Sequence, residues 1–157
     1  CPAERLETIE RLTRIGVSVR VRLDPLIPGL TDRADNLRPL LSELSRRGVR
    51  SIVASYLFLR PGFAQRVSRQ LEFALGSSWD IGAWSGQNFV EGLGSGRMIS
   101  TEERQARFTQ LRDLAAGFGI DVHVCACKNP RLQDNSDCKI AGPSPNAQPE
   151  PDTPLFF

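Results

Sequence analysis

The 157-residue sequence predicts an α/β fold in which helices and parallel strands alternate. Apolar residues recur at helical spacing in several segments, and short runs with the periodicity or the apolar content of strands lie between them. The resulting order is helix, strand, helix, strand, helix, helix, strand, which is typical of βα units with right-handed crossovers. Three strands cannot close a barrel by themselves. The sequence therefore predicts a single layer or part of a (β/α) barrel.

Two helix–strand units make up the first part of the chain. Apolar residues at every third position predict a helix from Pro2 to Ile15, which ends at Gly16. A strand is expected over 17–23, where apolar and polar residues alternate. The second helix begins at Asp35 or Asn36, and it ends at Gly48.

The next segments are a buried strand, a short helix and an irregular stretch. The nearly continuous apolar run over 51–59 indicates a parallel strand that is buried on both faces. A helix supported by Phe63, Val67, Leu71 and Ala74 follows it. Residues 76–96 contain both tryptophans and no clear periodicity, so we expect an insertion over one face.

A helix and a strand complete the predicted fold. Ser100 and Glu103 form a capping box, and the helix that they begin ends at Gly117 or Gly119. The last strand is expected over 120–126. We therefore divide the chain into an α/β part over 1–141 and a proline-rich tail over 142–157, which its composition predicts to be disordered.

Composition and charge restrict the function classes. The chain has 20 basic and 18 acidic side chains, so no strong overall field attracts nucleic acid or an anionic membrane. No apolar run is long enough to span a bilayer and no signal peptide opens the chain, so we expect a cytoplasmic protein without a membrane partner. The chain begins at Cys1 and enters a helical pattern at once, so we expect a fragment of a longer polypeptide.

The first strand is predicted to have one polar face. Because side chains alternate along a strand, Arg20, Arg22 and Asp24 lie on the side opposite Val21 and Leu23. This face either meets solvent, with an ion pair between Arg22 and Asp24, or it faces a ligand at the carboxyl end of the strand.

A family resemblance follows from the loop after this strand, which reads Pro-Leu-Ile-Pro-Gly-Leu-Thr-Asp, and from the helix before it. The helix carries Pro2, Arg5, Leu6, Ile9, Leu12 and Gly16 in the pattern Pro-x-x-x-Arg-Leu-x-x-Ile-x-x-Leu-x-x-x-Gly. Over roughly residues 1–62 the chain resembles the second half of a radical S-adenosylmethionine barrel, closest to the spore photoproduct lyase-like, "DNA repair photolyase" branch. The resemblance implies that residues 1–141 are the C-terminal portion of a TIM-like barrel.

The resemblance also implies a cofactor site and a reaction. Arg22 and Asp24 would be polar pocket residues, and Leu26, Pro28 and Gly29 would lie beside the adenosyl group. Enzymes of this family cleave S-adenosylmethionine reductively with a [4Fe-4S] cluster, and the 5′-deoxyadenosyl radical abstracts hydrogen from the substrate, in this branch a DNA lesion. The sequence lacks the Cys-x-x-x-Cys-x-x-Cys motif that holds this cluster. The chain is therefore expected to be inactive without an N-terminal half of the same polypeptide.

Four residues near the end of the chain are candidate metal ligands. On a continuous strand, His123, Cys125 and Cys127 would share one face, and Cys138 could return from a loop as a fourth ligand. Such a set suits zinc or an auxiliary iron–sulfur cluster, although the spacing matches no standard zinc pattern. The alternative is buried or redox-active thiols.

Two groups of arginines are candidate phosphate contacts. Arg46, Arg47 and Arg50 lie around one helix end, and Arg60, Arg66 and Arg69 lie around the next strand–helix junction. Arginines at helix ends also complement the helix dipole, which is the simpler interpretation of this pattern. The resemblance thus implies part of a radical S-adenosylmethionine enzyme, and the alternative is a stand-alone, metal-stabilised α/β binding module without catalysis.

Overall fold

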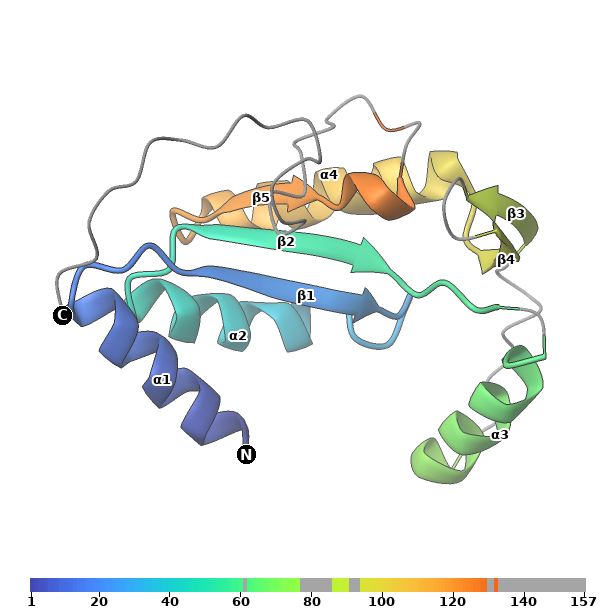
Figure 1. Cartoon of the computed structure of the whole chain (residues 1–157), viewed down its shortest axis with the longest axis horizontal. Helices are drawn as coiled ribbons and strands as arrows, with labels where there is room; N and C mark the ends of the chain where they lie inside the picture. The colour runs from blue at the N-terminus through green and yellow to red at the C-terminus, as the bar shows by residue number, and fades with distance from the viewer. Residues whose placement is uncertain (61, 77–85, 91–93, 130–131, 133–157) are drawn as a thin grey trace, which may run out of the picture.

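Three parallel strands form the central sheet in the order β1 (Arg20–Leu26), β2 (Ser51–Tyr56) and β5 (Asp121–Val124) (Figure 1). The computed structural model describes residues 1–60, 62–76, 86–90, 94–129 and 132, without the side chains of 86–95 and 127. The predicted mixed α/β class and the order of the helices and parallel strands are confirmed.

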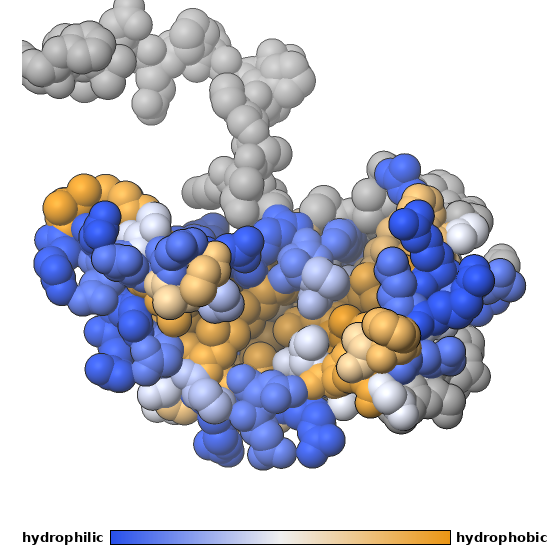
Figure 2. Space-filling view, turned by 90° about the horizontal axis from the view of Figure 1, so that it is seen from below, coloured by the Kyte–Doolittle hydropathy of each residue, from blue (hydrophilic) through white to orange (hydrophobic). Residues whose placement is uncertain are grey.

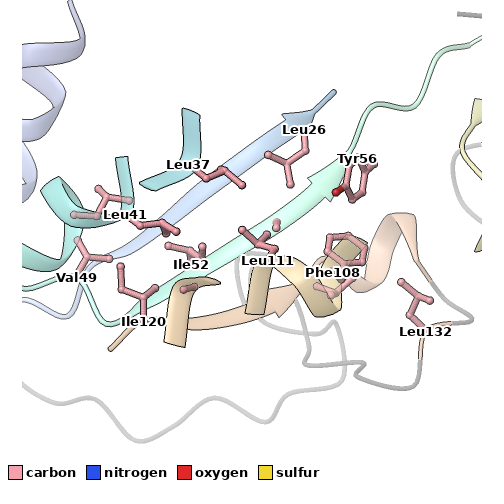
Figure 3. Close-up of a cluster of buried hydrophobic side chains, with 14 of the residues drawn as sticks. Leu26, Leu37, Leu41, Val49, Ile52, Tyr56, Phe108, Leu111, Ile120 and Leu132 are labelled. Atoms are coloured by element: carbon pink, nitrogen blue, oxygen red, sulfur yellow. The ribbon is translucent and has the colours of Figure 1, made fainter. Parts of the chain in front are cut away.

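Two helices cover one face of this sheet. α2 (Ala34–Arg46) and α4 (Thr101–Ala116) both contribute to a cluster of buried apolar side chains (Figure 3). Alternate residues of β2 belong to the same cluster, so both helices lie on the same side of the sheet. The cluster includes Leu37, Leu41, Leu44, Ile52, Ala54, Tyr56, Phe108, Leu111, Ala115 and Val124.

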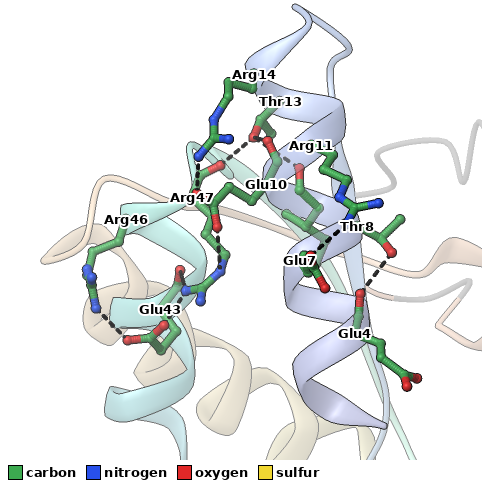
Figure 4. A network of polar contacts seen from close by, with 11 residues as sticks. Glu4, Glu7, Thr8, Glu10, Arg11, Thr13, Arg14, Glu43, Arg46 and Arg47 are labelled. Carbon is green, nitrogen blue, oxygen red and sulfur yellow. Dashed lines mark hydrogen bonds and ion pairs between the residues drawn. The ribbon is translucent and has the colours of Figure 1, made fainter.

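α1 (Pro2–Arg14) packs beside α2 through partly buried Leu6 and Ile9. The Thr13 hydroxyl donates a 2.7 Å hydrogen bond to the carbonyl of Arg47 at the end of α2 (Figure 4). Gly48 has φ +83°, a left-handed turn that glycine adopts without strain at the end of α2.

α3 (Ala64–Leu75) differs from the other helices because it stands apart from the sheet (Figure 1). None of its side chains is buried. The predicted helix is confirmed, but the residues that predicted it do not form a core face: Val67 and Leu71 are half-buried, whereas Phe63 and Ala74 are exposed.

A β-hairpin lies within the stretch that the sequence left irregular. β3 (Gly86–Val90) pairs antiparallel with β4 (Gly94–Met98), and Arg97 bridges to Leu59 beyond the end of β2. A Cβ at Gly96 would collide with the ring of Phe58, so glycine permits this close approach. The expectation of an irregular insertion over 76–96 was therefore wrong for the hairpin; residues 77–85 and 91–93 lie outside the described residues.

Each of the three parallel strands differs in its ends from the predicted one. A strand forms only where its backbone also pairs with a neighbouring strand, and the residue pattern alone does not show where this pairing begins and ends. β1 begins at Arg20 rather than at residue 17, since Arg20 pairs with Ser51, the first residue of β2. β2 ends at Tyr56 rather than at residue 59. β5 ends at Val124, and the chain then turns into a 3₁₀ helix (Ala126–Lys128) where the sequence predicted strand to residue 126. The predicted tail over 142–157 lies outside the described residues.

Candidate functional site

The face of the sheet opposite the helix-covered core carries the polar residues of β1. Val21 and Leu23 pack against the core, so Arg22 and Asp24 lie on the other face, as the alternation predicted. The strand register aligns Arg22 with Val53 of β2, and Val53 with His123 of β5. This face therefore combines polar groups at the edges of the sheet with an apolar residue in its centre.

Asp24 is the centre of an ion-pair cluster at the carboxyl end of β1. Its Oδ2 accepts hydrogen bonds from Nε and Nη2 of Arg22, at 2.9 and 2.7 Å. Its Oδ1 accepts a 2.7 Å hydrogen bond from Nζ of Lys128, which follows β5 in the 3₁₀ helix. The Asp24 side chain is 13% exposed. One carboxylate thus joins cations from both edges of the sheet, and the cluster has one net positive charge.

Cys125 lies beside this cluster and is fully buried. Its Sγ lies 3.5 Å from Nη2 of Arg22, and its carbonyl accepts a 2.8 Å hydrogen bond from Nδ2 of Asn129. Asn129 is itself buried, and its Oδ1 has no hydrogen-bond partner among the residues that the structure describes. The sequence grouped Cys125 with metal ligands but did not predict its contact with Arg22, which bridges 103 residues of sequence.

The Pro-Gly loop after β1 is fixed by Asp32. Oδ1 of Asp32 accepts a 2.6 Å hydrogen bond from the amide of Gly29, within the loop. Oδ2 accepts hydrogen bonds from the Tyr56 hydroxyl at 3.0 Å and from Nη1 of Arg107 at 2.8 Å. Burial, followed by the negative charge of Asp32, raises the pKa of Tyr56 above its ordinary value.

Sequence reasoning did not assign roles to Asp32, Tyr56 or Arg107. A signal was present at Asp32, which closes the loop motif three residues after Gly29, a spacing at which Asp side chains bind turn amides. No comparable signal existed for Arg107, because its ion pair with Asp32 spans 75 residues.

Three of the five predicted cofactor residues line one cavity of about 380 Å³. The cavity follows β1 to the point where the loop and α2 meet it, and its other polar lining comes from Thr31 and Asn36. The predicted residues that line it are Arg22, Asp24 and Leu26. Pro28 is buried and Gly29 is exposed with φ +69°, and neither lines this cavity.

A second, larger hollow of about 440 Å³ lies between α1, α2 and β1. Its apolar lining includes Leu6, Ile9 and Val21. Figure 2 views the molecule from the side of α1, α2 and β1 and shows apolar residues gathered in a hollow with a hydrophilic border. Because β1 is an edge of the described sheet, this side of the molecule combines a strand edge that no other described strand pairs with and an apolar surface.

The predicted metal site depended on a strand that continues to Cys127. β5 ends at Val124, so Cys127 lies in the 3₁₀ helix and the alternation that would align it with His123 and Cys125 is interrupted. The predicted strand alternation through Cys127 was therefore wrong. Side chains repeat every three residues in a 3₁₀ helix, whereas they repeat every two residues in a strand. Among the described residues no group of three or more His, Cys, Asp or Glu side chains could hold a metal ion. Cys138 and the Cys127 side chain lie outside the described residues, so zinc or cluster ligation stays a prediction.

No protein-family profile, curated protein or solved structure matches the chain. Within the described residues, no helix has the length and apolar content required to cross a membrane.

Proposed function

We propose that the chain provides late strands of a radical S-adenosylmethionine barrel of the spore photoproduct lyase-like branch. One observation carries the proposal: charged groups from β1 and from the segment after β5 converge on Asp24 at the carboxyl ends of parallel strands. In (β/α) barrels the active site is built at these ends. The loop motif and the helix before β1 add the sequence resemblance to this geometry.

The residues of this chain suit the adenosyl part of the cofactor and not its cluster. The cavity along β1 has the volume of a small-ligand site, and it combines leucine side chains with Arg22, Asp24, Thr31 and Asn36. The cluster motif is absent from the sequence, so its ligands must come from elsewhere. The free edge of β1 and the apolar hollow beside it are where an N-terminal half of the same polypeptide would add its strands.

In this proposal the bound cofactor supplies reductive radical chemistry, and the described residues bind and orient. Asp24, whose carboxylate is held by Arg22 and Lys128, is a lining residue of the cavity. Asp32 anchors the Pro-Gly loop to β2 and α4, so the loop backbone beside the cavity keeps one position. A DNA base in a lesion is the substrate that the resemblance favours.

The test uses the complete reading frame that contains this chain, purified without oxygen. We expect reductant-dependent formation of 5′-deoxyadenosine from S-adenosylmethionine. Asp24→Asn should weaken cofactor binding about tenfold, the loss expected for one hydrogen bond to a charged group. Asp35→Asn is the matched control, because Asp35 is an exposed carboxylate on α2 that does not line the cavity.

Two results would contradict the proposal. A stop codon and a start site immediately before Cys1 would favour the metal-stabilised binding module without catalysis. A loss of stability in Asp24→Asn with unchanged cofactor affinity would reduce the cluster to a structural ion pair.

A further inference from the structure

α3 presents an exposed row of arginine and phenylalanine side chains, which we call the α3 ridge: Phe63, Arg66, Arg69, Gln70 and Phe73. Residues three, four and seven positions apart lie on the same side of a helix, so these five side chains fall on one side of α3. All five are exposed; Phe63 is 56% exposed and Phe73 is 93% exposed. Large aromatic side chains this exposed are uncommon on a protein surface and indicate a binding surface.

The arginines of the α3 ridge differ from those of the other helices. In α1, Arg11 and Arg14 pair with glutamates one turn away (Figure 4). In α2, Arg46 and Arg47 both pair with Glu43, as Figure 4 also shows. This pairing engages two of the three arginines in the first group that the sequence offered as phosphate contacts, and the third, Arg50, donates hydrogen bonds to the carbonyls of Ser45 and Val49.

Arg66 and Arg69 form no ion pair in the part of the chain that the structure describes, and neither does Arg60 just before α3. Glu72 is the acidic residue of α3, and it is not paired with either arginine of the helix. Nε of Arg69 donates a 3.4 Å hydrogen bond to the carbonyl of Gln65, which leaves its two terminal nitrogens, like the guanidinium groups of Arg60 and Arg66, for an external anion. Because guanidinium groups match phosphate oxygens in a bidentate geometry, phosphate is the anion that this set suits best.

The two phenylalanines indicate that the partner carries flat groups as well as phosphates. Phe63 and Phe73 are ten residues apart, which corresponds to about 15 Å along a helix, and the arginines lie between them. Flat rings at both ends with cations between them match a chain that alternates phosphates with unstacked bases. We propose that the α3 ridge binds single-stranded nucleic acid, with bases stacked on Phe63 and Phe73 and phosphates bound by Arg60, Arg66 and Arg69.

An anionic lipid surface is the competing partner, and the geometry is less suited to it. A helix that lies in a membrane interface needs a continuous apolar face opposite its basic residues. In α3 the most exposed phenylalanine, Phe73, lies between Arg66 and Arg69 around the helix, while the apolar Val67 and Leu71 are half-buried. Membrane insertion of Phe73 would thus force the arginines towards the hydrocarbon.

This inference deepens the proposed function and rests on the DNA substrate named there, although α3 stands apart from the cavity along β1; absence of oligonucleotide binding would leave the test of S-adenosylmethionine cleavage unaffected. It is tested on the full 157-residue chain by fluorescence anisotropy with labelled oligo(dT) and oligo(rU) over a series of salt concentrations. With three phosphate contacts, log K should fall against log [salt] with a slope of about −2, at about −0.7 per contact. The double variant Arg66→Gln/Arg69→Gln should reduce this slope by about 1.4.

Two further variants separate the contributions. Phe73→Ala should weaken binding about fivefold or more without a change of slope, because it removes a stacking surface and no charge. Arg11→Gln/Arg14→Gln on α1 removes the same formal charge as the α3 double variant and should leave affinity and slope unchanged.

Three outcomes would overturn the proposal. The first is absence of binding to either oligonucleotide at low salt. The second is an equal loss in the α1 and α3 double variants, which would indicate an unspecific charge effect. The third is binding to phosphatidylserine-containing vesicles, measured by co-sedimentation, with none to the oligonucleotides. Circular dichroism should show unchanged helix content in each variant, because every substituted side chain is exposed.

Discussion

α2 and α3 have similar lengths and both are amphipathic, yet only α2 is part of the folded body. Leu37, Leu41 and Leu44 of α2 are buried, whereas α3 has no buried residue. The two helices also use arginine differently, since Arg46 and Arg47 at the end of α2 share Glu43 and the arginines of α3 remain without acidic partners among the described residues. Helical periodicity therefore predicts a helix, but it does not predict whether other parts of the protein pack on the apolar side of that helix.

Two phenylalanines give the strongest test of this comparison. Phe108 of α4 is 0% exposed and packs on Tyr56 with 5.1 Å between ring centroids, whereas Phe73 of α3 is 93% exposed. Phe108→Ala should lower the free energy of unfolding by about 3 to 5 kcal/mol, since it leaves a cavity in the core. Phe73→Ala should change it by less than about 0.5 kcal/mol. Urea unfolding followed by circular dichroism measures both values, and equal effects would show that α3 is covered in solution.

A second prediction concerns the hydrogen bond between Tyr56 and Asp32, which holds the loop after β1 against β2. Tyr56→Phe removes the hydrogen bond that the hydroxyl donates to Asp32 and should cost about 1.5 kcal/mol near pH 7. The pKa of Tyr56 is raised in the folded state, so above about pH 10 the unfolded chain loses a proton that the folded protein keeps. Folding stability should therefore decrease with pH in that range, by up to about 1.4 kcal/mol per pH unit.

The control for this pH dependence is the same variant. Tyr56→Phe carries no phenol, so its unfolding free energy should lack this contribution and the gap to the unsubstituted protein should narrow as pH rises. Unfolding curves at several pH values between neutral and alkaline conditions measure the gap. If the difference in unfolding free energy between the two proteins stayed constant with pH, Tyr56 would have the same pKa in the folded and the unfolded state.

The smallest expected effects concern the exposed arginines. Arg11→Gln breaks the ion pair with Glu7 four residues earlier and should cost about 0.3 to 0.5 kcal/mol. Arg66→Gln breaks no ion pair with the residues that the structure describes, so it should leave stability unchanged within the error of measurement. Thermal unfolding at low and high salt distinguishes them, because only the effect of Arg11→Gln should diminish with salt. A larger loss for Arg66→Gln would reveal a stabilising partner of α3.

The sequence predicted which helices and strands form more accurately than it predicted the residues at which they begin and end. Ser100 was expected to cap α4, and its side chain accepts a 3.1 Å hydrogen bond from the amide of Glu103. Two-residue alternation left two alternatives for the polar face of β1, an ion pair of Arg22 with Asp24 or a ligand-facing role, and the structure shows the ion pair. The predicted start of β1 was wrong because β1 begins where it pairs with the first residue of β2, and the predicted end of β5 was wrong because the chain turns into a 3₁₀ helix after Val124.

The residues of the candidate site also fall into two groups, those that local sequence predicted and those whose contacts are distant in sequence. Local sequence was sufficient to place Arg22 and Asp24 on one face and to identify the loop that follows them. It was insufficient for Lys128, Cys125 and Arg107, whose contacts with β1 and its loop join residues 75 or more positions apart.

What the sequence alone determined is the class of the fold, the helices, the polar face of β1 and the rigid loop that closes it. These features depend on interactions within a few residues, namely side-chain alternation, capping and the restricted backbone of proline. Only the tertiary structure decided that Asp24 joins both edges of the sheet, that Asp32 holds the loop to β2 and α4, and that α3 stands uncovered. The physical reason is that burial and long-range pairing depend on which segments meet in space, and periodicity along the chain carries no information about that choice.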